Sequence, residues 1–404
     1  MTGPLKGIRV ADFTRAMAGP MATMMLADMG ADVVKVEPPD GDETRTWGPP
    51  FHGSQSTYFL SANRNKRSLS VDLKSSNGKE IAERLIRSSD VVVENFRPGV
   101  ASRLGIGYEQ ASALNPLIVY CSISGFGQTG PWSMRPGYDL IALSESGLLS
   151  LTGEADGEPV KFGVPAADIA SGMFAAFSIV SALYQRKTSG KGQYIDVSLY
   201  DSMLYWLTHQ GQAYLSTGTV PSRMGSEHPN IAPYRVYPTG DGYITVCVGN
   251  EQTWKKLCEA LNLEELESDP RFSSNKLRVS NRAALDRLIS NRLKTQFSSH
   301  WLSKLEASGV PCARVRTVDQ AIENEHNQSR GVVAEIQHSE LGNLKTLFSP
   351  PRLSLTPADL TRAPPVLGQH TREILVELGY SDEEVEALLK EGAVRGPDSG
   401  KRLE

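Results

Sequence analysis

The chain has few cysteines and histidines, and neither residue type forms a metal or redox motif. Its four cysteines include no C-x-x-C pair, and its seven histidines include no H-x-x-x-H pair. We therefore expect neither a disulfide framework nor a bound metal ion. A basic excess is also lacking, since 42 Lys and Arg stand against 46 Asp and Glu. Contact with nucleic-acid phosphates needs surplus positive charge, so nucleic acid is not an expected partner.

Long apolar runs are absent as well. No segment approaches the roughly 18 uncharged apolar residues of a membrane span, and the first residues lack the charged and apolar regions of a secretory signal. We expect a cytoplasmic protein with no membrane partner. The chain has 404 residues, 40% of them hydrophobic, which is enough for about two or three domains with cores of their own.

The first half of the chain alternates short apolar strands with helical patterns. Strands rich in Val and Ile in this arrangement are typical of a parallel sheet covered by helices on both faces. The sequence thus predicts an α/β fold with a Rossmann-like sheet. A helix that is apolar nearly all round should lie in the core. The expected strands are 8–13, 33–37, 91–94, 118–122 and 194–198, and the expected helices are 18–29, 78–87, 108–114, 169–184 (the apolar one) and 199–215.

The pattern changes after the loop of residues 216–230, where Gly, Pro, Ser and charged residues cluster. Two strands then flank Thr239-Gly240-Asp241-Gly242, a hairpin signal, and helices follow. We expect a smaller α+β domain here. Its strands are 234–237, 243–248 and 313–315 and its helices 251–261, 282–295 and 300–307, while helices 371–378 and 382–389 end the pattern. The expected division is a large domain of residues 1–200 and 345–404, a linker helix and loop of residues 201–225, a small domain of residues 226–330 and a return linker of residues 331–344.

One glycine motif imitates a dinucleotide site. Residues 125–130, GFGQTG, match G-x-G-x-x-G after an expected strand. Pro131 and the residues after it prevent a helix from opening on this turn, so no helix N-terminus faces a pyrophosphate. We expect a flexible loop that can serve as a lid. A NAD-dependent dehydrogenase on the same sheet remains an alternative.

Asp168 lies just before the apolar helix, and two interpretations of it stay open. On composition alone an N-cap is favoured. Its neighbours Gly163, Ala166 and Ala167 are small, however, and leave room for a bulky reacting group. Cations at 63–67, Arg97 and Arg103 lie near strand ends, where open α/β sheets bind ligands.

Taken together, several segments resemble the class III, or CaiB/BaiF, family of coenzyme A transferases over about residues 5–389. The resemblance implies a large Rossmann-like domain built from both chain ends, an inserted small domain, two subunits interlocked as a homodimer, and CoA bound as acyl-CoA. The segments that carry it are residues 7–37, 65–74, 90–99, 124–131, 137–139, 167–172 and 367–371, the last of which reads LGQHT.

The resemblance also implies roles for single residues. Asp168 matches the nucleophilic aspartate of the family. Arg and Lys suit the phosphates of CoA, and an aromatic face such as Phe96 suits adenine. Relatives often carry an arginine after the strand-ending Glu37, where this chain has Pro38 and Pro39. The positions that match CoA contacts are Arg15, Ala16, Met17, Ala18, Val71, Asp72, Leu73, Lys74, Asn95, Phe96, Arg97, Arg103, Arg135 and Tyr138.

The substrates stay open between alternatives. An α-methylacyl-CoA racemase of the same family would need a histidine where this chain has Tyr138, and a phenol is a poor base at neutral pH. A noncatalytic CoA-binding protein is an alternative of another class. The glycine-rich loop of formyl-CoA transferases is not found, whereas Arg223 and His228 suit the far carboxylate of a dicarboxylic acyl group such as succinyl. Asp139, Arg223 and His228 are the candidate substrate residues.

Overall fold

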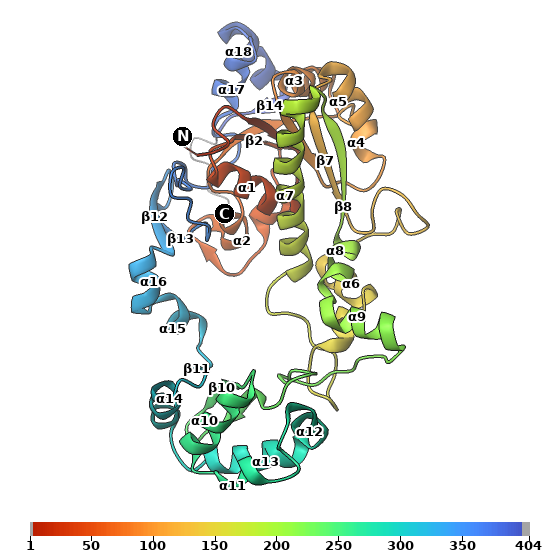
Figure 1. The fold of residues 1–404 in the computed structure, drawn as a ribbon. Helices are drawn as coiled ribbons and strands as arrows, with labels where there is room; N and C mark the ends of the chain where they lie inside the picture. The colour runs from red at the N-terminus through yellow and green to blue at the C-terminus, as the bar shows by residue number, and fades with distance from the viewer. Residues whose placement is uncertain (1–2, 398–404) are drawn as a thin grey trace. The chain divides into compact units, whose positions relative to one another are not determined.

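The computed structural model describes residues 3–397, which form two compact units. Among these residues the first unit comprises 3–148, 161–217 and 326–397, and the second comprises Leu149–Val160 and Gly218–Glu325. Figure 1 shows the sheet of the first unit and the helices around it.

A seven-stranded sheet forms the centre of the first unit. Six strands run parallel in the order β5-β2-β1-β6-β7-β8, and β14 pairs antiparallel with β5 at one edge. In chain order, β2 and β5 are added on one side of β1, and β6, β7 and β8 are then added on its other side. The strand order therefore reverses between β1 and β6. Open α/β sheets bind ligands at the carboxyl ends of the strands at such a reversal. The strands are β1 (Arg9–Asp12), β2 (Asp32–Glu37), β5 (Lys66–Val71), β6 (Val91–Glu94), β7 (Val119–Ser124), β8 (Gln193–Ser198) and β14 (Val394–Arg395).

Helices cover both faces of this sheet, as the strand composition predicts. Alternate strand residues enter different cores: Val10 and Val33 pack on one face, and Ala11 and Val34 on the other. The first face is covered by α1 (Ala18–Asp28), α6 (Asp139–Glu145), α7 (Ala166–Ser189) and α8 (Leu199–Trp206). The second is covered by α3 (Ser76–Arg87), α4 (Val100–Arg103), α5 (Tyr108–Leu114), α17 (Thr371–Glu377) and α18 (Asp382–Glu391).

Helix α7 is longer and more exposed than the sequence predicts. One side packs in the core, but Met173, Phe177, Val180 and Tyr184 form a stripe on the other side, each of them 43% to 74% exposed. The expectation of a fully buried helix is therefore wrong for this face. Among the described residues α7 is also the one helix long and apolar enough to span a membrane, but 56% of its most apolar window is buried, which is typical of a core helix.

The expected helix over residues 199–215 is broken in two. Helix α8 ends at Trp206 and α9 (Thr208–Thr217) begins two residues later. Thr208 has a φ of 44°, which a β-branched residue rarely adopts and which interrupts the helical path. Both helices belong to the first unit, where Met203 and Leu207 pack against the core, so the expected linker does not start at residue 201.

The second unit has the α+β composition that the sequence predicts. Strands β9 (Tyr234–Pro238) and β10 (Tyr243–Cys247) form the predicted hairpin, closed by the bond from Thr239 N to Gly242 O (2.9 Å), and β11 (Cys312–Arg314) pairs with β10. The helices are α10 (Glu251–Leu261), α11 (Glu265–Ser268), α12 (Asn275–Ser280), α13 (Arg282–Leu293), α14 (Ser298–Ala307) and α15 (Val318–Ile322).

The remaining elements differ from the expected linkers. Residues 149–160 belong to the second unit, although the sequence suggested one large domain up to residue 200. The expected return linker forms a hairpin of β12 (Val333–His338) and β13 (Gly342–Leu347) in the first unit, after α16 (Glu325–Arg330). The short elements η1 (Glu43–Thr46), β3 (Phe51–His52), β4 (Gln55–Ser56) and α2 (Thr57–Ser61) follow β2, and η2 (Leu148–Leu151) follows α6.

Candidate active site

Three of the expected CoA-contact residues meet where the strand order reverses. Asn95, after β6, holds the turn after β1 with both ends of its amide. The Arg15 N–H donates to Asn95 Oδ1 (2.8 Å), and Asn95 Nδ2 donates to the Arg15 carbonyl (2.8 Å). The Arg15 guanidinium lies 5.3 Å from the centre of the Phe96 ring. The exposed Arg15 and half-buried Phe96 thus present a cation and an aromatic face side by side.

Two fully buried lysines donate hydrogen bonds to the backbone on either side of this turn. Lys35 Nζ donates to the Thr14 carbonyl (3.0 Å) and pairs with Asp42 (2.8 Å). Lys66 Nζ donates to the Pro20 carbonyl (2.9 Å) and pairs with Asp12 (3.1 Å). Because both carbonyls flank residues 15–18, the lysines fix the backbone of the expected CoA turn.

In this network, attraction between opposite charges offsets part of the free-energy cost of burying each ion. Burial opposes the ionisation of Asp12, but the charges of Lys66 and Lys35 keep its pKa below the usual aspartate value. Burial lowers the pKa of Lys66 to about 8, and the charge of Asp12 opposes that change. A lysine within the apolar run of residues 33–36 was the sequence signal for this support, and the sequence analysis missed it.

The other expected CoA residues lie at the same edge of the sheet, because their strands are parallel. Val71 ends β5 and residues 72–74 follow it, where Lys74 is exposed and its N–H donates to Asp72 Oδ1 (3.0 Å). Arg97 and Arg103 are exposed on either side of Gly99, near the start and end of α4. These cations are open to solvent, and their contact with CoA stays a prediction.

The glycine loop after β7 does not lead directly into a helix. Gly125 and Gly137 pack so closely that an added Cβ on Gly125 would lie 2.6 Å from the Gly137 Cα. Helix α6 begins at Asp139, two residues beyond this contact. The expectation that no helix opens directly on GFGQTG is therefore confirmed.

Two expected CoA contacts lie in or beside this loop. Arg135 pairs with Glu145, and its guanidinium lies 4.7 Å from the centre of the Trp132 ring. Its charge is therefore already partly neutralised within the protein. Tyr138 is exposed at the N-cap position of α6.

Asp168 is the third residue of α7, so the N-cap interpretation is wrong. The N-cap position is Pro165, which supplies no side-chain bond. Asp139 performs that task instead: its Oδ1 accepts from Ala167 N at 2.7 Å and from Asp168 N at 3.5 Å. The Asp168 carboxyl group itself accepts no hydrogen bond from the part of the chain that the structure describes.

The environment of Asp168 makes its carboxylate unusually basic. Burial first, and then the negative charge of Asp139, raise its pKa to about 7. Burial also raises the pKa of Asp139, against the bonds that it accepts from Ala167 and Asp168. Aspartates with such perturbed pKa values cluster at functional sites.

The charges of this site act on Tyr58, a residue that the sequence analysis did not find. The half-buried ring packs edge-on against Trp47, with ring centres 4.9 Å apart. Burial, followed by the charges of Asp168 and Asp139, raises the pKa of Tyr58 to about 12. Its phenol therefore stays protonated beside the two carboxylates and can donate a hydrogen bond. No sequence pattern connects residue 58 with residue 168, since the chain brings them together only by folding.

Arg223 and His228 lie in the second unit, on the loop before β9. Arg223 donates to two main-chain carbonyls of residues 149–160, those of Glu154 (3.3 Å) and Gly157 (2.9 Å). His228 Nδ1 accepts from Asn230 N (3.1 Å), and its ring packs on Tyr234 at 5.2 Å. Both residues thus shape their loop, and a contact with substrate stays a prediction. Within residues 3–397 no group of three or more His, Cys, Asp or Glu is arranged to hold a metal ion.

Comparison with known proteins places this geometry in a family. The sequence profile described as CoA-transferase family III matches residues 5–371. The chain is 43% identical to succinyl-CoA:glutarate CoA-transferase from Mus musculus, over 97% of this chain and 90% of that protein. It is 40% identical to succinate–glutarate CoA-transferase from Agrobacterium fabrum, over 93% of this chain and 96% of the relative.

Solved structures of related proteins have the same fold as this chain. A CaiB/BaiF family protein from Brucella suis superposes with a TM-score of 0.84 at 41% identity, covering 94% of this chain and all of the other. Rv3272 from Mycobacterium tuberculosis gives a TM-score of 0.83 at 30% identity, over 92% of this chain and 99% of its own. The chain belongs to CoA-transferase family III and is a CoA-transferase.

Proposed function

We propose that Asp168 transfers CoA from an acyl-CoA donor to a carboxylic acid acceptor by becoming acylated itself. An Asp168 oxygen attacks the thioester carbonyl and expels CoA thiolate, which leaves a mixed anhydride. The thiolate then attacks the aspartyl carbonyl, releases the donor acid and forms an aspartyl-CoA thioester. The acceptor carboxylate attacks that thioester, and the returning thiolate takes the acceptor acyl group and restores the Asp168 carboxylate. No net proton is consumed.

The observation that carries this proposal is the state of the Asp168 carboxyl group. It is half-buried, it accepts no hydrogen bond from residues 3–397, and its pKa rises to about 7. A carboxylate that binds a proton more tightly also attacks a carbonyl carbon more readily, and at neutral pH a large fraction is still ionised. A purely structural helix-capping acid would instead accept bonds from N–H groups, as Asp139 does.

Tyr58 is the residue that we expect to stabilise the reaction. Attack by Asp168 places a negative charge on the thioester oxygen, and a donor aimed at that oxygen lowers the barrier. The Tyr58 phenol stays protonated because of its burial and the neighbouring carboxylates. It can donate to the oxyanion without giving up its proton. Closure of the glycine loop, residues 125–130, would exclude water from the anhydride.

The CoA moiety should lie along the carboxyl ends of the parallel strands. Arg15 and Phe96 form a cation and ring pair there, and Lys74, Arg97 and Arg103 are exposed at the same edge. The diphosphate and the 3′-phosphate of CoA require such cations, and the adenine suits the Phe96 face.

Succinyl-CoA or another dicarboxylic acyl-CoA is the proposed donor. Relatives named for succinyl-CoA and glutarate share 40% to 43% identity with this chain over nearly its whole length. Arg223 binds main-chain carbonyls through Nε and Nη2, so its Nη1 group can meet a distal carboxylate. Tyr138 in place of a histidine disfavours the racemase alternative.

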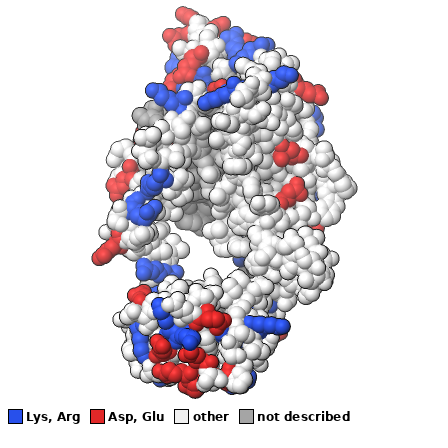
Figure 2. All heavy atoms as spheres, in the orientation of Figure 1, with Lys and Arg blue, Asp and Glu red and all other residues white. Residues whose placement is uncertain are grey.

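We further propose that two subunits form an interlocked homodimer in the cytoplasm. The apolar stripe on α7 supports an interface, because burying a row of large apolar side chains against a partner lowers the free energy. Tyr205 and Leu215, on α8 and α9, extend the exposed apolar surface. Figure 2 shows few charged side chains on the face of the first unit where α7 lies.

A panel of donors and acceptors tests the function. Purified protein is incubated with succinyl-CoA and, in turn, glutarate, oxalate, acetate or a longer monocarboxylate, and new CoA thioesters are identified by mass spectrometry. We expect the fastest transfer to a dicarboxylate. Asp168→Ala should abolish transfer, whereas the control Asp156→Asn, which changes an exposed acid of the second unit, should leave it unchanged. Full transfer by a folded Asp168→Ala protein would refute the proposal.

A further inference from the structure

The LGQHT segment has no part in the proposed reaction, yet it lines a cavity of the first unit. The cavity has a volume of about 320 Å³. Its walls come from β12, from the extended segment before Val366 and from the turn that precedes α17. The lining residues are Ile336, Gln337, Ser339, Thr361, Arg362, Ala363, Pro364, Gln369 and His370. None of them is acidic, and none belongs to the site around Asp168.

Arg362 brings an uncompensated positive charge to this cavity. Its side chain is half-buried and forms neither an ion pair nor a hydrogen bond with residues 3–397. Its backbone, in contrast, is held firmly: Arg362 N donates to Asn65 Oδ1 (3.0 Å), and Asn65 N donates to the Arg362 carbonyl (2.9 Å). The backbone position of Arg362 is therefore fixed, and all the N–H donors of its guanidinium are available to a ligand.

His370 supplies a second donor, and its tautomer follows from its bonds. Ser68 N donates to His370 Nδ1 (3.2 Å), so a neutral ring carries its hydrogen on Nε2. A second bond, from His370 N to the Ser68 carbonyl (3.0 Å), fixes the residue to β5. Burial first lowers the pKa of His370, Glu373 opposes that change, and the charges of Arg362 and Arg67 lower the pKa further. The ring is thus neutral near pH 7 and offers one N–H.

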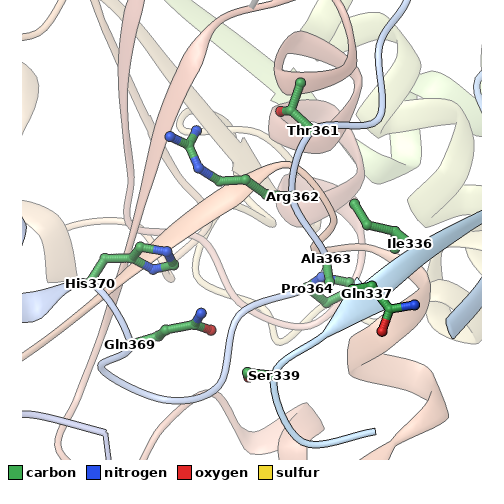
Figure 3. A pocket seen from close by; sticks show the side chains of 9 residues that line it. All are labelled: Ile336, Gln337, Ser339, Thr361, Arg362, Ala363, Pro364, Gln369 and His370. Atoms are coloured by element: carbon green, nitrogen blue, oxygen red, sulfur yellow. The ribbon is translucent and has the colours of Figure 1, made fainter. Parts of the chain in front are cut away.

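Gln369 is oriented in the same way. Its Oε1 accepts from Val366 N (3.0 Å), which leaves the NH₂ group as the free end of the amide. Figure 3 shows the Arg362 side chain extending toward the side on which His370 lies, with Gln369 nearby on the same turn. Three hydrogen-bond donor groups and no carboxylate therefore line the cavity.

We propose that this cavity binds a small oxyanion, a carboxylate or a phosphate, with Arg362 as the charged contact and Gln369 and His370 as neutral donors. Oxyanions accept several hydrogen bonds at once, and a guanidinium binds them with two parallel bonds. Because Asn65 and Ser68 lie close together in the chain and hold the two principal donors, little ordering is needed on binding. The site is separate from the proposed chemistry at Asp168 and does not depend on it.

Calorimetric titration of the whole protein tests the site. Inorganic phosphate and succinate are the two probes, each at constant ionic strength, so that a phosphate source and a carboxylate source are distinguished. The test variant is Arg362→Gln. The matched control is Arg287→Gln, which removes an exposed arginine of α13 that does not line the cavity.

Arg362→Gln should weaken binding of the preferred probe about 10-fold or more, as expected for loss of a charge-assisted bond. Arg362→Lys should retain part of the affinity, and Arg287→Gln should bind as the unchanged protein does. All four proteins should keep the same CoA transfer rate without added anion, which shows that they are folded. The proposal is wrong if neither probe binds at millimolar concentration, or if Arg362→Gln and Arg287→Gln lose affinity equally.

Discussion

Replacing Asp168 by Asn should stabilise the protein while it abolishes CoA transfer. The pKa of Asp168 rises from 3.8 to about 7. A difference of that size corresponds to about 4 kcal/mol of opposition to the charge in the folded protein. Since the side chain is half-buried, solvent screens part of this, and we expect a gain of about 2 kcal/mol for the neutral amide.

The gain must depend on pH in a defined direction. Near pH 4 the folded protein carries protonated Asp168, which resembles Asn, so the two proteins should be equally stable. As the pH rises from about 4 to 7, the unfolded chain loses this proton before the folded chain does, and the native protein loses stability. Asp168→Asn escapes that loss, so its advantage should grow over this range and level off above pH 7.

Urea denaturation of both proteins between pH 5 and 8 measures this difference. Asp156→Asn, at an exposed position, is the control and should show no growing advantage. The reasoning would be refuted if Asp168→Asn were less stable than the unchanged protein at pH 8, or if its advantage were the same at every pH.

Three further changes test the support of the site. Asp139→Asn should keep the bond from Ala167 N but remove a negative charge, so the pH midpoint of kcat/KM should move to lower pH; an unchanged midpoint would contradict the assigned electrostatics. Lys66→Met leaves Asp12 with less compensation and should lower the free energy of unfolding by about 3 kcal/mol, measured by denaturation, and the double variant with Asp12→Asn should recover much of it. Arg15→Ala should raise KM for acyl-CoA about 10-fold with kcat nearly unchanged, and a fall in kcat alone would exclude a binding role.

Much of the large unit follows from local patterns in the sequence. Short Val- and Ile-rich strands between amphipathic helices specify a doubly covered parallel sheet, and β6 and α5 lie at the predicted residues. The chain order then brings Arg15 and Asn95 together, because both follow neighbouring parallel strands. Such predictions succeed where the spacing of apolar residues indicates both the type of element and the side of it that is buried.

Other features depend on contacts that no local pattern records. Strand β5 begins with Lys66 and Arg67, which do not look buried until Asp12 and Asp32 are seen to pair with them. Asp139 caps α7 from a helix well upstream of Asp168, so the local sequence suggested the wrong acid for the N-cap.

Helix α7 shows a further limit. An apolar composition on every side indicates burial but does not say whether the protein's own core or another surface provides it. The break between α8 and α9 rests on one backbone angle at Thr208 and had no signal of composition.

The central claim is that Asp168 becomes covalently bound to CoA. Intact protein is incubated with succinyl-CoA in the absence of an acceptor, quenched with acid, and weighed by mass spectrometry before and after digestion. We predict a mass increase equal to CoA minus water, located on the peptide that contains Asp168 and absent from Asp168→Asn. Rapid transfer with no such adduct, or an adduct on another residue, would contradict the mechanism.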